Sequence, residues 1–288
     1  MAVILITGAS GQLGSELKVV SENFRGYEFI FTDTNELDIT DHEKVKQFIK
    51  SSSPDWLINC AAYNFVDMAE DEPARATLIN STGVRNIVEA VKGSECHLIH
   101  FSTDYVFNGN SNVPNNETSP TEPLGAYGIS KLSGEKEALL HHGSMVIRTS
   151  WLYSSFGNNF LKTIIRKGKE RGLLKVVFDQ TGSPTYAADL ASAIMNIVAG
   201  VIRNRVAFNA GIYHYTNEGV CSWFDFATEI ISEAGINCKV LPVLSAEYPT
   251  VARRPFYSVL NKSKIKETYN LEIPHWRENL KKCIKILS

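Results

Sequence analysis

Apolar runs alternate with amphipathic segments through the first half of the chain. The runs are short and rich in β-branched or aromatic residues, which predicts strands at 3–7, 27–33, 55–62, 97–103 and 145–150. Apolar residues at helical spacing predict helices at 11–21, 41–50, 70–91 and 127–141. The strands are almost continuously apolar, as strands covered on both faces are. We therefore predict an α/β fold with a Rossmann-type, doubly wound parallel sheet.

The alternation becomes less regular beyond residue 150. Helices are predicted at 160–172, 186–200 and 223–235, and strands at 174–178 and 212–216. We assign residues 1–150, with returning segments at about 178–205, to a dinucleotide-binding domain. Residues of about 151–177 and 206–288 are assigned to a smaller C-terminal substrate-binding lobe. The stretch 108–123 has no apolar periodicity, and a loop of that length suggests a functional role.

A glycine-rich turn joins the first predicted strand to the first predicted helix. In TGASGQLG (7–14), glycine stands at Gly8, Gly11 and Gly14. Because glycine has no Cβ, a pyrophosphate can approach the backbone N–H groups and the helix N-terminus closely. A plain strand-to-helix turn is the alternative. The place of this turn in the first strand–helix unit of an alternating chain favours dinucleotide binding.

Two acidic residues are candidates for the ribose end of such a dinucleotide. Asp33 ends the second strand, 19 residues after Gly14, where a carboxylate accepts from the ribose 2′-hydroxyl of NAD and repels a 2′-phosphate. An aspartate that only stabilises a turn at the strand end is the alternative. Asp38, in LDITD (37–41), is a second candidate for the adenine or ribose region. The sequence therefore leaves the choice between NADH and NADPH open.

A tyrosine and a lysine stand four residues apart at the start of a predicted helix. They are Tyr127 and Lys131 in AYGISK (126–131), and this spacing puts both on one helix face. An unperturbed tyrosine has a pKa of about 10, and a nearby lysine charge lowers that pKa by favouring the phenolate. Ser102 and Thr103 end the fourth strand, where a hydroxyl is placed to bind a substrate carbonyl. An exposed polar helix face is the alternative, but the glycine-rich turn favours a catalytic pair.

Composition excludes several classes of function. The 288 residues carry 29 basic and 31 acidic side chains, and 44% are hydrophobic. This balance argues against a nucleic-acid-binding or membrane-surface protein. The five cysteines form no CxxC pair, which argues against a disulfide framework or structural zinc and favours a reducing compartment. The apolar start MAVILITG is too short for a signal peptide or a membrane span, so we expect a cytoplasmic protein.

Several motifs together resemble one enzyme family. TGASGQLG, STDYVF (102–107) and YGISK (127–131) look like those of the extended short-chain dehydrogenase/reductases. Further motifs resemble successive signatures of the dTDP-4-dehydrorhamnose reductase family and reach residue 261: LDITD (37–41), PDWLINCAAYNFVDMAE (54–70), STDYVFNG (102–109), EPLGAYGISKLSGE (122–135), RTSWLY (148–153), GNNF (157–160), DQTGSPT (179–185) and RRPFYSVLN (253–261). The resemblance therefore covers nearly the whole chain.

This resemblance implies a reaction and a set of contacts. The reaction is NAD(P)H-dependent reduction of the C4 keto group of dTDP-4-dehydro-L-rhamnose, a dTDP-linked 4-keto-6-deoxy-sugar, to dTDP-L-rhamnose. By similarity, Tyr127 protonates the C4 oxygen, Lys131 tunes Tyr127 and holds the nicotinamide ribose, and Thr103 binds the carbonyl. The implied cofactor contacts are Gly8, Ser10, Gly11, Gln12, Leu13, Asp33, Asp38, Ile39, Ala61, Ala62, Tyr63, Ser102, Tyr127 and Lys131. The implied substrate contacts are Val66, Thr103, Asp104, Tyr105, Trp151, Asn159 and Arg254, the last two toward dTDP.

The resemblance also brings a metal and a homodimer into consideration. Some members of the family bind magnesium at a dimer contact, and Glu16 falls where one ligand is expected. A glutamate in the first turn of a helix also simply suits the helix dipole, which is the alternative.

Two positions depart from the family pattern, and two other functions stay open. Asn64 stands where a small hydroxyl residue is expected, and Ser130 replaces a more usual threonine. A reductase or epimerase for another nucleotide sugar is therefore one alternative. The other is a non-catalytic regulatory subunit resembling that of methionine adenosyltransferase. The intact set of Thr103, Tyr127 and Lys131, with GNNF and RRP, favours the enzyme.

Overall fold

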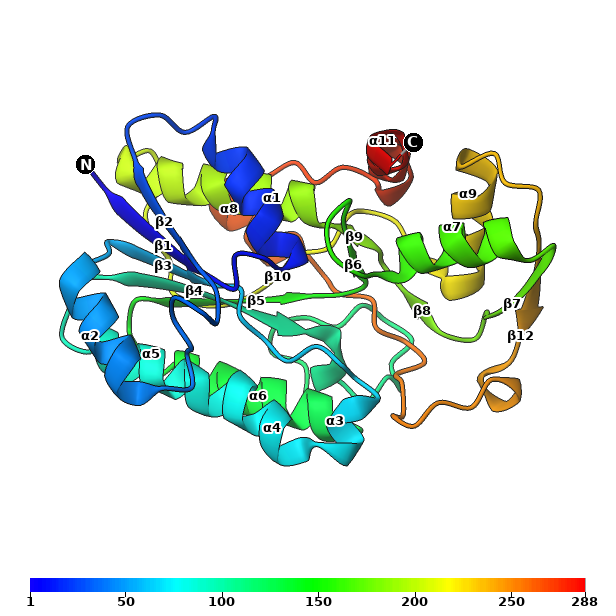
Figure 1. The fold of residues 1–288 in the computed structure, drawn as a ribbon, viewed down its shortest axis with the longest axis horizontal. Coiled ribbons are helices and arrows are strands. Elements are labelled where there is room, and N and C mark those ends of the chain that lie inside the picture. Colours follow the sequence, from blue (N-terminus) through cyan, green and yellow to red (C-terminus); the bar gives the residue numbers. More distant parts are fainter. Residues whose placement is uncertain (288) are drawn as a thin grey trace.

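A parallel sheet of six strands forms the centre of the computed structural model, which describes residues 1–287 (Figure 1). The strands stand in the order β10-β5-β4-β3-β1-β2, and each pair of neighbours is parallel. Their bounds are β1 Val3–Thr7, β2 Glu28–Thr32, β3 Trp56–Asn59, β4 His97–Thr103, β5 Ser144–Thr149 and β10 Gly211–His214. This confirms the predicted Rossmann-type sheet. The strand order reverses between β1 and β3, and ligands bind at such a switch point.

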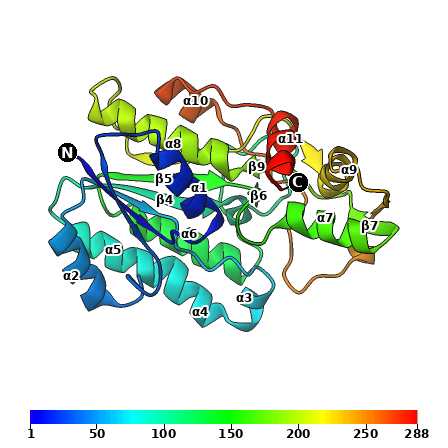
Figure 2. The same ribbon diagram turned by 45° about the horizontal axis from the view of Figure 1, so that its top comes forward.

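Helices cover both faces of the sheet (Figures 1 and 2). On one face lie α1 (Gln12–Ser21) and α8 (Ala187–Ile202), and on the other lie α2 (His42–Ser52), α5 (Gly83–Val91) and α6 (Ala126–Ala138). Successive residues of β1 serve opposite faces: Ile4 and Ile6 belong to the buried cluster with α8, while Leu5 belongs to the cluster with α2 and α5. Burial on both faces explains why the strands are apolar throughout.

The segment 70–91, predicted as one helix, consists of several pieces. They are α3 (Met68–Asp71), α4 (Pro73–Thr77), a single π-helical turn (Leu78–Thr82) and α5. Pro73 has no backbone N–H and occupies the first turn of α4, where that donor is not needed. The prediction that residues 70–91 are helical is therefore confirmed apart from a break at Glu72, after which Pro73 starts a new helix.

A smaller lobe lies beyond the carboxyl ends of the strands (Figure 1). Its own buried cluster includes Leu161, Phe226 and Trp276. The longer elements are α7 (Phe160–Glu170), β7 (Leu173–Val177), α9 (Trp223–Glu233), β12 (Lys239–Val243) and α11 (Trp276–Leu287), with β7 and β12 paired in parallel. Short pairs join β6 (Leu152–Tyr153) to β9 (Thr185–Tyr186) and β8 (Thr181–Gly182) to β11 (Cys221–Ser222).

Two segments that we assigned to the lobe lie with the main sheet. Strand β10 pairs with β5, and helix α10 (Ser263–Tyr269) contributes Ile265 to the buried cluster that includes Ile194 of α8. The predicted domain boundaries stay a prediction, and these segments are the reason to draw them differently. Residues 108–123 contain no helix and only an isolated bridge from Asn115 to Leu260. Within residues 1–287, no helix combines the length and apolar character that crossing a membrane requires.

Candidate active site

The glycine-rich turn has the geometry that a dinucleotide pyrophosphate needs. Gly8 has φ +65°, and a Cβ there would lie 2.6 Å from the amide nitrogen of Ala61. A Cβ on Gly14 would collide with the carbonyl oxygen of Gly8. Gly11 is the N-cap of α1, and no side chain caps that helix, so its first N–H groups are available to an anion. The turn is therefore a fitting cradle for a dinucleotide.

This turn opens into a cavity of about 420 Å³. Gln12 and Leu13 line its sheet side, and Trp151, Asn159 and Arg254 line its lobe side. Between them lie Cys60, Ala62, Asn64, Val66, Phe101, Ser102, Thr103, Asp104, Tyr105, Tyr127 and Lys131. The cavity thus brings the carboxyl ends of β3 and β4 together with the first turns of α1 and α6, as parallel sheets do at a ligand site.

Tyr127 lies in the first turn of α6 and is 8% exposed. Its hydroxyl donates to Oδ1 of Asn64 over 3.4 Å and also contacts the Thr103 hydroxyl. Burial raises the pKa of Tyr127 above its usual value, although the bond with Thr103 lowers it slightly. We expected Lys131 to lower this pKa. That expectation is wrong for the protein alone, because desolvation outweighs the other effects on Tyr127.

Lys131 lies one turn further along α6 and is buried beneath the cavity. Its Nζ donates to the carbonyl oxygen of Phe101 over 2.6 Å. Burial lowers the pKa of Lys131 to about 8, and the Glu135 carboxylate opposes this decrease. The ammonium group is therefore mostly charged at neutral pH and close to its midpoint slightly above it.

Thr103 ends β4 and presents its hydroxyl between two groups. Its Oγ1 accepts from the backbone N–H of Tyr105 over 3.2 Å and donates to Oδ1 of Asp104 over 3.0 Å. Burial raises the pKa of Asp104 to about 6. The Tyr105 ring packs edge-on against that of Tyr127, with centroids 5.4 Å apart. These contacts hold the hydroxyl of Thr103 beside that of Tyr127. Its hydrogen must turn from Asp104 toward the substrate before it can donate to a carbonyl oxygen.

Comparisons with known proteins find relatives that match the whole chain. The family model described as "RmlD substrate binding domain" matches residues 1–288. The dTDP-4-dehydrorhamnose reductase of Aggregatibacter actinomycetemcomitans is 42% identical over 290 residues, with 98% of each chain covered. The chain belongs to the dTDP-4-dehydrorhamnose reductase family. Solved reductases of Clostridium acetobutylicum (41% identity, TM-score 0.92, 99% of each chain) and of Bacillus anthracis with NADP (40%, 0.93, 100% of each) share its fold.

The cofactor contacts implied for a member of this reductase family fall into two groups. Gly11, Gln12, Leu13, Ala62, Ser102, Tyr127 and Lys131 line the cavity. Gly8, Ser10, Asp33, Asp38, Ile39, Ala61 and Tyr63 lie outside its lining. Asp33 accepts from the backbone N–H of Ser10 over 2.8 Å, which places this carboxylate at the glycine-rich turn. Asp38 instead binds Thr40 over 2.8 Å.

Three of these implied contacts have their side chains directed elsewhere. Ile39 is buried in the apolar cluster under α2 and α5. The hydroxyl of Ser102 donates to Glu135 over 2.5 Å, although Ser102 also lines the cavity. Tyr63 is buried, and its hydroxyl donates to Glu72 over 3.1 Å. For Ser102 and Tyr63, a cofactor contact through the side-chain hydroxyl stays a prediction without geometric support. For Ile39, a contact could come only through its backbone or its apolar side chain.

All seven implied substrate contacts line the cavity. Asn159 accepts from the N–H of Lys162 as the N-cap of α7 and donates to Oε1 of Gln12. Arg254 forms an ion pair with Asp67 over 2.9 Å.

Trp151 has φ +48° and stacks on Trp223 with ring centroids 3.6 Å apart. Trp223 also lines the cavity, and it was not predicted because WFDF looks like the apolar face of a helix.

A second hollow of about 620 Å³ adjoins the cavity within the lobe. The two share Phe160, Trp223 and Arg254. Its basic lining consists of Lys167, Arg171, Lys175 and Arg254, and Tyr248 adds an aromatic ring. Only Arg254 of these basic residues lies in a recognisable motif. The other three, Lys167, Arg171 and Lys175, come from a helix end and a strand and look like ordinary solvated residues. The hollow suits a nucleotide diphosphate.

Glu16 does not sit in a metal cluster. It is 4% exposed and accepts from the hydroxyl of Ser154 over 2.6 Å, and burial raises its pKa. No group of three or more His, Cys, Asp or Glu residues suited to a metal occurs within residues 1–287. A carboxyl buried inside one chain does not fit a magnesium ligand at a contact between two chains. The predicted magnesium site therefore has no support from the structure.

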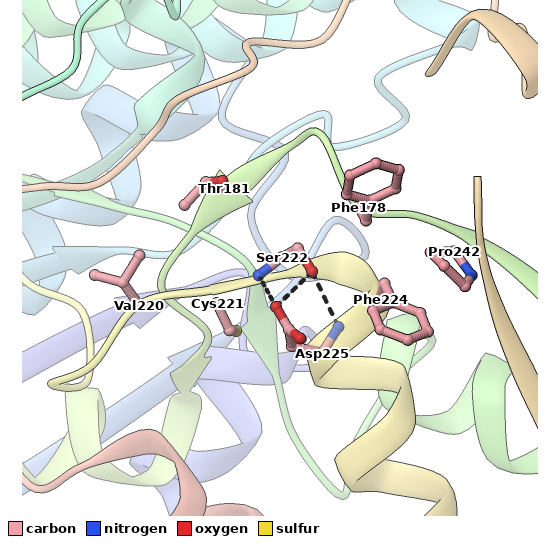
Figure 3. Close-up of a pocket in the computed structure, with 8 residues that line it drawn as sticks. All are labelled: Phe178, Thr181, Val220, Cys221, Ser222, Phe224, Asp225 and Pro242. Carbon is pink, nitrogen blue, oxygen red and sulfur yellow. Dashed lines mark hydrogen bonds between the residues drawn. The ribbon is translucent and has the colours of Figure 1, made fainter. Parts of the chain in front are cut away.

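Another hollow, of about 510 Å³, lies in the lobe at the start of α9 (Figure 3). Ser222 and Asp225 are its hydrogen-bonding pair, and they cap helix α9 by binding each other's backbone N–H groups. Phe178 and Pro242 lie on its other side (Figure 3). The polar side-chain atoms of Ser222 and Asp225 therefore already serve the helix cap.

Proposed function

We propose that the chain reduces the C4 keto group of dTDP-4-dehydro-L-rhamnose to dTDP-L-rhamnose with NADPH or NADH in the cytoplasm. The convergence of Thr103, Tyr127 and Lys131 at one cavity carries the proposal. This cavity runs from a dinucleotide cradle to a basic hollow, so a nicotinamide and a nucleotide sugar fit at its two ends. The dTDP-4-dehydrorhamnose reductase named for Bacillus anthracis was solved with NADP, which supports a nicotinamide cofactor.

Carbonyl reduction needs a hydride and a proton on one carbon–oxygen bond. The bound nicotinamide supplies the hydride. Tyr127 retains its proton at neutral pH because burial raises its pKa, so it is ready to protonate the C4 oxygen. Thr103 shares that oxygen through its hydroxyl. The charge of Lys131 then stabilises the phenolate that Tyr127 becomes, which is where a nearby ammonium matters most.

The basic hollow accounts for the nucleotide half of the substrate. The guanidinium groups of Arg254 and Arg171 match the geometry of a diphosphate. Asn64 stands within reach of the Tyr127 hydroxyl, so the departure from the family pattern lies directly beside the acid. Asn64 can therefore alter which 4-keto nucleotide sugar is preferred, and assays with several such sugars test this.

A coupled set of assays tests the proposal. Purified protein with dTDP-4-dehydro-L-rhamnose and NADPH should lose absorbance at 340 nm, and the product should match dTDP-L-rhamnose. Running the assay with NADH, and with other 4-keto nucleotide sugars, decides cofactor preference and the alternative substrates. The carboxylate of Asp33 beside the turn favours a free 2′-hydroxyl, so NADH should be accepted.

Further experiments address the regulatory-subunit alternative, the magnesium site and the homodimer. No loss of absorbance with any nucleotide sugar, together with tight binding to a methionine adenosyltransferase, would support the regulatory subunit instead. Adding EDTA or magnesium should leave the rate unchanged, because Glu16 is bound to Ser154. Light scattering at several concentrations tests the proposed homodimer.

A further inference from the structure

A buried ion pair joins helix α6, which carries Tyr127 and Lys131, to strand β5. Glu135 follows Lys131 by one turn on α6, and Arg148 lies on β5. Nε and Nη2 of Arg148 donate to the two carboxylate oxygens of Glu135 over 2.8 and 2.7 Å, and both side chains are 2% exposed. Neither residue lines the cavity, so neither touches a ligand there. A desolvated bidentate pair of this kind holds a fixed geometry.

The same carboxylate closes a ring of contacts with the end of β4. Glu135 accepts from the hydroxyl of Ser102 over 2.5 Å. The preceding residue, Phe101, accepts from Nζ of Lys131 over 2.6 Å. Helix α6 is thus tied to β4 at two points one turn apart. Thr103 is the next residue of β4, so these ties set where its hydroxyl lies relative to Tyr127.

Glu135 is also the carboxylate that acts on the charge of Lys131. The titratable groups that act on Lys131 are Glu135 from α6, Cys60 from the end of β3 and His100 from β4. Tyr127 lies one turn earlier on α6, and Arg148 of β5 pairs with Glu135. Burial raises the pKa of Cys60 and Tyr127 and lowers that of His100, so all three are neutral at neutral pH. The negative charge of Glu135 favours the ammonium form of Lys131.

We propose that Glu135 is a positioning residue for the reduction: through Ser102 it fixes the end of β4 against α6, and its charge keeps Lys131 an ammonium ion. Arg148 holds the carboxylate in the orientation that both tasks need. This proposal rests on the proposed function only where turnover is measured. A purely structural ion pair would hold α6 in place without affecting the charge of Lys131.

Four variants separate these roles. Glu135→Gln keeps the shape and removes the charge. Glu135→Asp keeps the charge and shortens the reach to Ser102. The double variant Glu135→Leu with Arg148→Met removes the pair without leaving one buried charge alone, a change that folds well in other proteins. Glu137→Gln is the matched control, because Glu137 lies on the same helix and pairs with Arg85 away from the cavity.

The pH dependence of turnover is the first measurement. We expect Glu135→Gln to lower kcat roughly 10- to 100-fold with little change in KM for the sugar nucleotide. The decline of kcat at high pH should begin about one pH unit lower, because loss of a nearby negative charge lowers the pKa of Lys131. The double variant loses the charges of both partners and the contact with Ser102, so its kcat should also fall, while its decline at high pH should shift less than that of Glu135→Gln. Glu135→Asp should retain the wild-type decline, and Glu137→Gln should match wild type throughout.

NADPH binding, followed by energy transfer from tryptophan across the same pH range, is the second measurement. Lys131 is proposed to hold the nicotinamide ribose. The pH above which NADPH affinity declines should therefore be lower in Glu135→Gln than in wild type. If wild type binds NADPH but reduces no nucleotide sugar, the proposed function is wrong and this measurement still decides the role of Glu135. A folded Glu135→Gln variant with wild-type pH profiles for both measurements, or a folded double variant with wild-type kcat, would overturn the proposal.

Discussion

Gln12 and Asn159 join the two sides of the cavity through one hydrogen bond. Nδ2 of Asn159, at the start of α7, donates to Oε1 of Gln12, at the start of α1, over 2.9 Å. The first helix of the dinucleotide-binding part is therefore connected to the first long helix of the lobe. Close by, the hydroxyl of Ser154 donates to Glu16 of α1. Ligands bound at the two ends of the cavity therefore both lie near the joined starts of α1 and α7.

We predict that Asn159→Asp weakens the coupling between the two ligands without destabilising α7. Aspartate caps a helix as well as asparagine does, so the bond to the N–H of Lys162 is kept. The amide that donates to Gln12 is lost, and a carboxylate then faces the Gln12 oxygen. KM for both ligands should rise severalfold while the melting temperature stays within a few degrees of wild type. A large loss of stability would instead show that the cap itself was lost.

Tyr127→Phe tests the acid directly. Removing the hydroxyl takes away the proton donor but leaves the ring and its packing against Tyr105. Turnover should fall roughly 10²- to 10⁴-fold, the usual contribution of acid–base catalysis. NADPH affinity, measured by fluorescence, should stay within about twofold. Turnover at the wild-type rate would remove Tyr127 as the acid.

The lowered pKa of Lys131 leads us to predict that turnover declines at high pH. Its pKa of about 8 means that the ammonium ion is present below pH 8 and is lost as the pH rises through that value. The phenolate formed by Tyr127 loses its neighbouring charge in the same range, so kcat should decrease above about pH 8. Lys131→Met should abolish most activity, and what remains should lack this decline. A wild-type kcat constant up to pH 10 would contradict this assignment.

The sequence predicted what depends on local pattern and spacing. The strands of the sheet, the turn at Gly8 and the four-residue spacing of Tyr127 and Lys131 are all readable over a few residues. The partner of Glu135 was not readable, because Arg148 is 13 positions away and meets it only after β5 joins the sheet. The direction of the Tyr127 pKa was also missed, since it depends on how deeply the folded chain buries the ring.

The lobe was harder to predict for the same physical reason. Lys167, Arg171 and Lys175 look like solvated charges in the sequence, and only the packing of α7 beside β7 brings them to one hollow. Trp223 likewise resembles a core residue at the start of an amphipathic helix. Its stacking on Trp151 depends on the positive φ of Trp151, which a bulky residue adopts only when its surroundings enforce it. The family motifs identified Trp151 and Arg254, but they gave no information about these partners.

Arg254→Gln should affect substrate binding more than the chemical step. The guanidinium lines both the catalytic cavity and the basic hollow, where it is placed for a diphosphate, and it already pairs with Asp67 in a partly buried position. Loss of a charged hydrogen-bonding partner costs about 2 kcal/mol, so KM for the sugar nucleotide should rise roughly 10- to 100-fold. Titration of dTDP against the free protein should show the same loss, with NADPH affinity unchanged. Arg166→Gln is the control, because Arg166 pairs with Glu170 on the exposed side of α7. Equal losses in both variants would mean that net charge, and not the position of Arg254, determines the affinity for the nucleotide.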